Sequence, residues 1–162
     1  MNTRIDVSLT VNGERVARQI EARQHLIDFL RLELGLMGSH TGCEHGVCGT
    51  CTVRLDGRIV RGCLVLAASL DGAKVETIEG LSETGEIRDL QDAFIARNAC
   101  QCGYCTPGML LAAAELLREK PRPKREEIRD YLSGNYCRCT GYQAIVDAIA
   151  ATAAARERAS QG

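Results

Sequence analysis

Cysteine is the residue that most constrains how this chain of 162 residues can fold, because nine cysteines are present and eight of them fall into two groups. The first group has the spacing C-x4-C-x2-C-x11-C and consists of Cys43, Cys48, Cys51 and Cys63. The second group has the spacing C-x2-C-x31-C-x-C and consists of Cys102, Cys105, Cys137 and Cys139. An odd number of cysteines fits a closed set of disulfides poorly. Metal ligation therefore explains these cysteines better than disulfide bonding.

The first group resembles a known type of metal loop, because its first three cysteines have the spacing of plant-type [2Fe–2S] ferredoxins. Such a loop must approach an anionic cluster closely and direct backbone N–H groups at the sulfur atoms, which glycine allows. Gly42, Gly46 and Gly49 meet this need, and Cys63 would close the site from beyond a hairpin. Structural zinc usually takes two C-x2-C pairs, and this group has one. The spacing therefore favours [2Fe–2S] over zinc.

Two histidines, His40 and His45, lie in or beside this loop. A Rieske centre would need two histidines in place of two cysteines on one of its irons. Because four cysteines are already available, we interpret both histidines as facing solvent or bonding to the backbone.

The second group is ambiguous on spacing alone, and zinc is a serious alternative there. Cys105 precedes Thr106 and Pro107, which suit the N-cap and the first turn of a helix. Cys139 precedes the segment 140–143, whose sequence TGYQ has the pattern of a capping box. Two helix N-termini would then direct partial positive charge at one anionic centre. This arrangement predicts a metal site at one end of a group of helices.

Hydrophobic periodicity predicts an α+β fold, with a β-rich first half and a helical second half. In the first half we expect one helix at 26–34. We also expect five strands, at 5–11, 14–20, 52–55, 58–61 and 74–78. Asn12-Gly13 and Asp56-Gly57 are typical of tight hairpin turns.

The second half begins with a turn-rich segment, 80–85, which we expect to be a linker. Helices are expected after it at 88–98, 107–119, 124–133 and 141–154, and the polar residues 155–162 are expected to fray. We therefore predict two domains, 1–79 and 80–162.

Charge and hydropathy argue against binding to nucleic acid and against insertion in a membrane. The formal net charge is −1, so nothing indicates binding to nucleic acid or to an anionic membrane surface. No apolar run approaches the roughly 18 residues that a membrane-spanning helix needs. The first residues lack the hydrophobic core of a signal peptide, and we therefore expect a cytoplasmic protein.

Three segments together resemble the iron–sulfur small subunit of the xanthine oxidase family of molybdenum hydroxylases. They are CEHGVCGTCTV at 43–53, QCGYCTPGM at 101–109 and CRCTGY at 137–142. The resemblance extends from about residue 5 to about residue 150. One position departs from the family pattern, because Cys100 stands where an aliphatic residue is usual. We interpret Cys100, which lies outside both groups, as a small buried hydrophobic residue.

This resemblance implies a ferredoxin-like β-grasp domain followed by a four-helix bundle domain, with a [2Fe–2S] cluster on each cysteine group. It further implies that Gln101 and Cys139 lie near the molybdopterin cofactor of a large subunit. That cofactor is expected to be of the molybdopterin cytosine dinucleotide type. Electrons would pass from it through the Cys102 group and then the Cys43 group to FAD in a medium subunit. The expected assembly is a dimer of heterotrimers, and the large subunit would determine the substrate.

Two alternatives of other classes are a stand-alone ferredoxin-type electron carrier and a zinc-stabilised interaction module. The sequence offers no catalytic nucleophile or general base that we can identify, so substrate chemistry is expected on a partner chain. A free carrier would not need Gln101 or a whole helical domain. A zinc module would be colourless, whereas two clusters would give about four iron atoms per chain.

Overall fold

Five strands form one mixed sheet in the first half of the chain, in the order β2-β1-β5-β3-β4. The structure is a computed structural model and describes residues 4–161. The strands are β1 (Arg4–Val11), β2 (Glu14–Glu21), β3 (Thr52–Leu55), β4 (Arg58–Arg61) and β5 (Lys74–Glu76). β1 pairs parallel to β5, and the other neighbouring strands pair antiparallel. In β1, Val7, Leu9 and Val11 are buried and alternate with less buried residues, as expected for a strand with one buried face, whereas Ile5 near its start is exposed.

Both predicted hairpin turns are present. Asn12 and Gly13 have φ values of 50° and 86°, and Asp56 and Gly57 have φ values of 47° and 85°. Two consecutive positive φ values are the mark of a type I′ turn, whose twist matches that of the flanking strands. The second turn matters most for the metal site, because it pairs Thr52 with Arg61 and so brings the chain after Cys51 beside the chain before Cys63.

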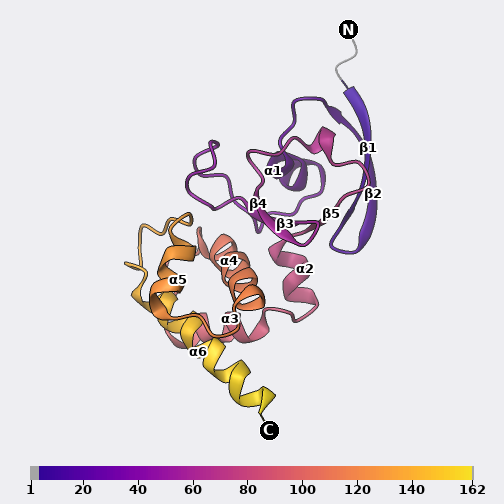
Figure 1. Ribbon diagram of the computed structural model, residues 1–162. Coiled ribbons are helices and arrows are strands. Elements are labelled where there is room, and N and C mark those ends of the chain that lie inside the picture. The colour runs from indigo at the N-terminus through magenta and orange to yellow at the C-terminus, as the bar shows by residue number, and fades with distance from the viewer. Residues whose placement is uncertain (1–3, 162) are drawn as a thin grey trace.

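A helical segment lies across one face of the sheet, close to the predicted range 26–34 (Figure 1). It consists of α1 (Leu26–Asp28) and a π-helical turn, η1 (Phe29–Glu33). Leu26, Phe29 and Leu30 are fully buried against the strands. A short 3₁₀ helix, η2 (Ala67–Ser69), precedes β5. The sheet and this helical segment therefore share one apolar core.

The second half is helical, and Figure 1 shows it on the other side of β3 and β4 from α1. Its helices are α2 (Ile78–Glu83), α3 (Arg88–Ala96), α4 (Thr106–Glu119), α5 (Arg125–Leu132) and α6 (Gln143–Ser160). The last four correspond to the four predicted helices. They bury a second apolar cluster, which includes Leu90, Leu111 and Ile149. None of the helices formed by residues 4–161 combines the length and apolar character needed to cross a membrane.

Two sequence expectations about this half are wrong. The segment 80–85 is not a linker, because α2 occupies most of it. Gly80 serves close packing rather than a turn, since an added Cβ would lie 2.4 Å from Asn12 Oδ1. Residues 155–160 do not fray but continue α6, because the Arg156 guanidinium bonds to both Asp89 carboxylate oxygens at 2.7 and 2.9 Å. The fork lowers the pKa of Asp89, since the charged carboxylate is the form it binds.

Buried polar side chains hold the sheet and the helices together. The Arg54 side chain of β3 is only 5% exposed, and its guanidinium donates to the Glu86 carboxylate at 2.6 and 3.0 Å. The Glu115 carboxylate of α4 is buried, and accepts from Ile59 N–H of β4 at 2.8 Å and from Tyr131 O–H at 2.7 Å. Removing one partner of such a bond would leave a buried polar group without a hydrogen-bond partner. These contacts fix how the two halves are oriented.

Candidate metal centres

The first cysteine group surrounds the loop that leads into β3. Cys51 and Cys63 are buried, because they flank the β3–β4 hairpin, and Gly62 N–H donates to Cys51 O at 3.0 Å. Cys43 and Cys48 lie further out on the loop and are partly buried. The hairpin therefore brings Cys63, which is distant in sequence, to the two later cysteines of the loop.

The loop directs hydrogen-bond donors at sulfur, as predicted. Cys48 N–H donates to Cys43 Sγ at 3.4 Å, and the Thr50 hydroxyl lies 3.2 Å from Cys48 Sγ. Backbone N–H groups, first that of Cys48, lower the pKa of Cys43 to about 6 because they stabilise its thiolate. Gly46 and Gly49 have φ values of 84° and 75°, which residues with a side chain rarely adopt. The loop is thus shaped to receive negative charge on its sulfur atoms.

Both loop histidines bond to backbone carbonyl oxygens, which confirms their interpretation. His45 Nδ1 bonds to Cys43 O, and His40 Nδ1 lies 3.0 Å from Tyr104 O. The His40 ring also stacks on the Tyr104 ring, with centroids 4.4 Å apart. Since Tyr104 lies between two cysteines of the second group, this stack connects the two cysteine loops.

The second group comes from the segments before α4 and α6. Cys102 Sγ and Cys139 Sγ lie 3.6 Å apart, and both residues are exposed. Cys105 is partly buried, and burial, followed by its contact with the Cys137 side chain, raises the pKa of Cys105 to about 12. Gln101 is exposed beside Cys102, so one edge of this group is open at the surface.

The predicted helix caps of this group are wrong in detail. Cys105 itself is the N-cap of α4, and Thr106 is the first residue of the helix. No capping box opens α6, which begins after Tyr142 in a left-handed conformation with a φ of 67°. The Thr140 hydroxyl instead donates to Cys137 Sγ at 3.1 Å, and Tyr142 Oη accepts from Cys137 N–H at 2.9 Å. Thr140, one of the predicted cap residues, therefore bonds to the cysteine loop.

Cysteine side chains approach one another within each group. Contacts between side chains join Cys43 with Cys48, Cys51 with Cys63, Cys105 with Cys137, and Cys102 with Cys139. Within residues 4–161, no three His, Cys, Asp or Glu side chains converge as ligands of a single ion. Four thiolates, two on each of two metal ions, are the ligand set of a [2Fe–2S] cluster.

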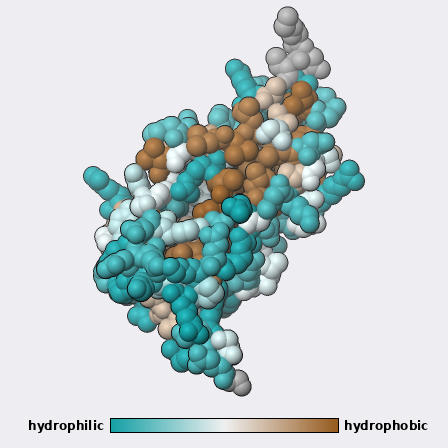
Figure 2. All heavy atoms as spheres, in the orientation of Figure 1, coloured by the Kyte–Doolittle hydropathy of each residue, from teal (hydrophilic) through white to brown (hydrophobic). Residues whose placement is uncertain are grey.

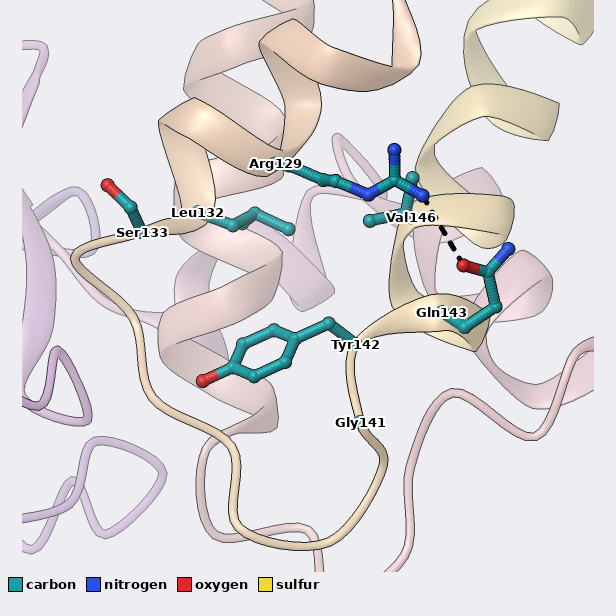
Figure 3. Close-up of a pocket in the computed structure, with 7 residues that line it drawn as sticks. All are labelled: Arg129, Leu132, Ser133, Gly141, Tyr142, Gln143 and Val146. Carbon is teal, nitrogen blue, oxygen red and sulfur yellow. Dashed lines mark hydrogen bonds between the residues drawn. The ribbon is translucent and has the colours of Figure 1, made fainter.

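A cavity of about 350 Å³ adjoins the second group, between α5 and α6 (Figure 3). Leu132, Val146 and the Tyr142 ring form its apolar walls. Arg129 and Gln143 lie at its rim and share a hydrogen bond of 3.4 Å. The Tyr142 ring faces this cavity while its hydroxyl bonds to the cysteine loop, so Tyr142 connects the two.

Sequence reasoning missed the two threonines and the tyrosine that bond to the cysteine loops. Thr50 and Thr140 each lie within three residues of the cysteine whose sulfur they contact. A hydroxyl residue so close to a ligand was the available signal, but Thr140 was interpreted as a helix cap. The role of Tyr142 had no such signal, because it depends on the left-handed turn that precedes α6.

Comparison with known proteins agrees with this geometry. Residues 77–150 match a "[2Fe-2S] binding domain" family model, and residues 37–96 match a "2Fe-2S iron-sulfur cluster binding domain" model. The chain is 50% identical to the nicotine 6-hydroxylase small subunit of Paenarthrobacter nicotinovorans, covering 90% of this chain and 88% of that protein. It is 48% identical to caffeine dehydrogenase subunit gamma of Pseudomonas sp. (strain CBB1), covering 88% and 87%.

Solved structures give the same result. A chain of quinoline 2-oxidoreductase from Pseudomonas putida 86 superimposes with a TM-score of 0.90 at 47% identity, covering 97% of this chain and 98% of that one. Aldehyde oxidoreductase from Desulfovibrio gigas has a TM-score of 0.87 at 40% identity, and there the match covers 96% of this chain but 17% of that one. The same fold thus occurs both as a separate chain and as one part of a much longer chain.

Proposed function

Since this chain belongs to the family of [2Fe–2S]-binding small subunits of the molybdenum hydroxylases, the xanthine oxidase family, we propose that it connects a molybdopterin-binding large subunit to an FAD-binding medium subunit by electron transfer. The chain is an iron–sulfur subunit of an oxidoreductase. The direction of transfer that we propose runs from the molybdopterin side through the second cysteine group and then the first. The observation that carries this proposal is that the fold gathers two separate sets of four cysteines within one chain: the β3–β4 hairpin brings Cys63 beside Cys51, and Cys139 Sγ lies 3.6 Å from Cys102 Sγ.

We assign one [2Fe–2S] cluster to each group. Cys43, Cys48, Cys51 and Cys63 would hold the first, and Cys102, Cys105, Cys137 and Cys139 the second. A bound [2Fe–2S] cluster accepts and releases one electron at a time. The residues of this chain would fix the positions of the sulfur atoms, stabilise their negative charge with N–H and O–H donors, and limit access of water.

The exposed edge of the second group supports its assignment to the molybdopterin side. Cys102, Cys139 and Gln101 are exposed there, so a cofactor on a partner chain can approach them closely. By contrast, Cys51 and Cys63 of the first group are buried. We therefore propose that Gln101 and Cys139 face the molybdopterin of a large subunit, in a dimer of heterotrimers.

Apolar side chains near the first group support a second protein contact. Figure 2 shows that the apolar residues on this face gather over the sheet half, whereas the helical half is mostly hydrophilic. Val47 and Leu64 are 43% and 62% exposed, and each adjoins a cysteine of the first group. Leu64 lies over Gly46, next to Val47, so the two side chains are neighbours, and contiguous exposed apolar side chains are typical of protein interfaces. We propose that this surface contacts the FAD-binding subunit.

Two domains, a β-grasp domain at 1–79 and a helical bundle domain at 80–162, are part of the same proposal. Their support is the separation of the two apolar clusters, one among the strands with α1 and one among the helices. The helical cluster begins at Ile78, close to the proposed boundary.

The decisive experiment is iron and sulfide analysis of the purified chain with its copurifying partners, combined with EPR of the reduced protein. We expect about four iron atoms per chain and two distinct signals. Copurification with one large and one medium chain is expected as well. A single signal, tightly bound zinc, or a chain that purifies without partners would contradict the proposal.

Two matched substitutions test whether each threonine tunes its own group. Thr50→Val removes the hydroxyl beside Cys48 Sγ, and Thr140→Val removes the one beside Cys137 Sγ. A lost O–H···S bond of about 1 kcal/mol should make the reduction potential of the adjacent centre more negative by roughly 40 mV. Each variant is the control for the other in an EPR-monitored redox titration. Equal shifts of both centres in either variant would contradict this prediction.

A further inference from the structure

Arg61 bridges the two cysteine groups. It is the last residue of β4 and lies two positions before Cys63. Its Nη1 donates to Thr52 Oγ1, next to Cys51. Its Nη2 donates to Gly134 O at 2.7 Å and to Asn135 Oδ1 at 3.2 Å, in the segment that leads to Cys137. One guanidinium is therefore bonded at both loops.

The loops that Arg61 joins are in direct backbone contact. Tyr136 N–H donates to Cys48 O at 2.8 Å, and Asn135 Nδ2 donates to Gly49 O at 3.2 Å. Asn135 is 2% exposed. Because Arg61 donates to Asn135 Oδ1, the amide group of Asn135 is oriented with Nδ2 toward Gly49. We call this contact between residues 48–49 and 134–136 the seam.

The positive charge of Arg61 is not neutralised by a carboxylate. Among the described residues, none of its bonded acceptors carries a charge, and no acidic side chain lies within 4.0 Å of it. Arg54, which is buried between the two halves, has both Glu86 and Glu76 as ion-pair partners. A guanidinium keeps its proton in proteins, so the charge at the seam is permanent. In partly buried surroundings, such a charge acts over longer distances than in water.

We propose that Arg61 raises the reduction potential of both candidate clusters by holding one uncompensated positive charge at the seam between them. The inference rests on the proposed function, because it needs a cluster on each group. Reduction of each centre adds one electron, and thus one negative charge. A nearby fixed positive charge stabilises the reduced form relative to the oxidised form. Since Arg61 is bonded at both loops, its charge acts on both centres.

The test is an EPR-monitored titration of the full chain with its copurifying partners, with dithionite as the electron donor. In Arg61→Gln, we expect both midpoint potentials to become more negative. At a fixed applied potential, the ratio of reduced to oxidised centre should fall about tenfold, which corresponds to a shift of about 59 mV. Arg61→Lys keeps the charge, so most of the shift should be absent. Arg58→Gln is the matched control, because it removes the same charge from an exposed position on the same strand and should shift neither potential.

A second variant covers the possibility that Arg61→Gln does not assemble. Asn135→Asp places a carboxylate against the intact guanidinium and should shift both potentials in the same direction. The inference is overturned if Arg61→Gln shifts neither midpoint potential or only one of the two. It is also overturned if Arg61→Lys shifts both potentials as far as Arg61→Gln does. With Arg61→Gln unassembled, unchanged potentials in Asn135→Asp overturn it. Absence of two EPR signals in the unmodified protein would instead defeat the proposed function, so the two failures are distinguishable.

Discussion

Replacing Cys105 by alanine is expected to remove about half of the iron, from about four to about two atoms per chain, and one of the two EPR signals. Cys105 is the N-cap of α4, and its side chain contacts that of Cys137. Without this sulfur, one of the two metal ions of the second group keeps a single thiolate. Because [2Fe–2S] clusters are held by four protein ligands, we expect the whole second cluster to be lost.

The first cluster should survive in this variant. Its four cysteines lie in the loop before β3 and directly after β4, and none belongs to the helical half. Iron analysis and EPR of the reduced protein measure both effects. Retention of four iron atoms would show that Cys105 is not a ligand, and loss of both signals would show that the two groups do not assemble independently.

Cys100→Ala is the matched control for Cys105→Ala. It removes a thiol two residues from Cys102. The sequence-based interpretation of Cys100 as a buried residue is wrong, because Cys100 is exposed. None of the sulfur pairs of the second group includes Cys100. Iron content and both EPR signals should therefore equal those of the unaltered chain. This pair of variants separates ligation from the general effect of deleting a cysteine in this segment.

Local sequence rules predicted the parts of the fold that depend on local interactions. The alternation in β1, the Asn12-Gly13 turn and the spacing of Cys43, Cys48 and Cys51 each involve residues close together in the chain. Positive φ values at Gly46 and Gly49 were likewise predictable, because a loop that wraps around a centre must turn tightly.

The errors arose where contacts between distant segments decide the outcome. Gly80 was interpreted as a loop residue, but it lies in α2, where its missing side chain makes room for Asn12. Thr140 was interpreted as a cap, but its hydroxyl contacts Cys137 Sγ. The end of α6 depends on Asp89, which lies 67 residues from Arg156. Periodicity cannot register such contacts, since they exist only once the two halves have packed.

The seam is the clearest example of a feature hidden from the sequence. Gly108 stands in the first turn of α4, where glycine is a poor helix former and alanine would be expected. An added Cβ at Gly108 would lie 2.3 Å from Gly49 O. Gly49 O also accepts hydrogen bonds from Asn135 Nδ2 at 3.2 Å and Thr52 Oγ1 at 2.6 Å. The glycine is therefore required by the opposite loop and not by its own helix.

We accordingly expect Gly108→Ala to destabilise the protein by about 2 kcal/mol or more. Helix propensity alone would stabilise the variant by about 1 kcal/mol. Overpacking against a rigid backbone costs about 1–3 kcal/mol, and moving the Gly49 carbonyl also weakens the two side-chain hydrogen bonds to it, at about 1 kcal/mol each. The steric collision costs more than the gain in helix propensity, so we expect the free energy of unfolding to fall. Urea denaturation of the full chain, followed by far-ultraviolet circular dichroism, measures the change.

Gly57→Ala is the control that separates collision from backbone strain. At Gly57 an added Cβ meets nothing within 4 Å, but φ is +85°. The free energy of unfolding of Gly57→Ala should therefore fall by only about 1 kcal/mol, which is the cost of placing alanine in the left-handed conformation. If Gly108→Ala were as stable as the unaltered chain, the backbone at Gly49 would be able to move away from the added Cβ at no cost in free energy. The contact between the two cysteine loops would then be too soft to hold the two groups at a fixed separation, which electron exchange between them requires.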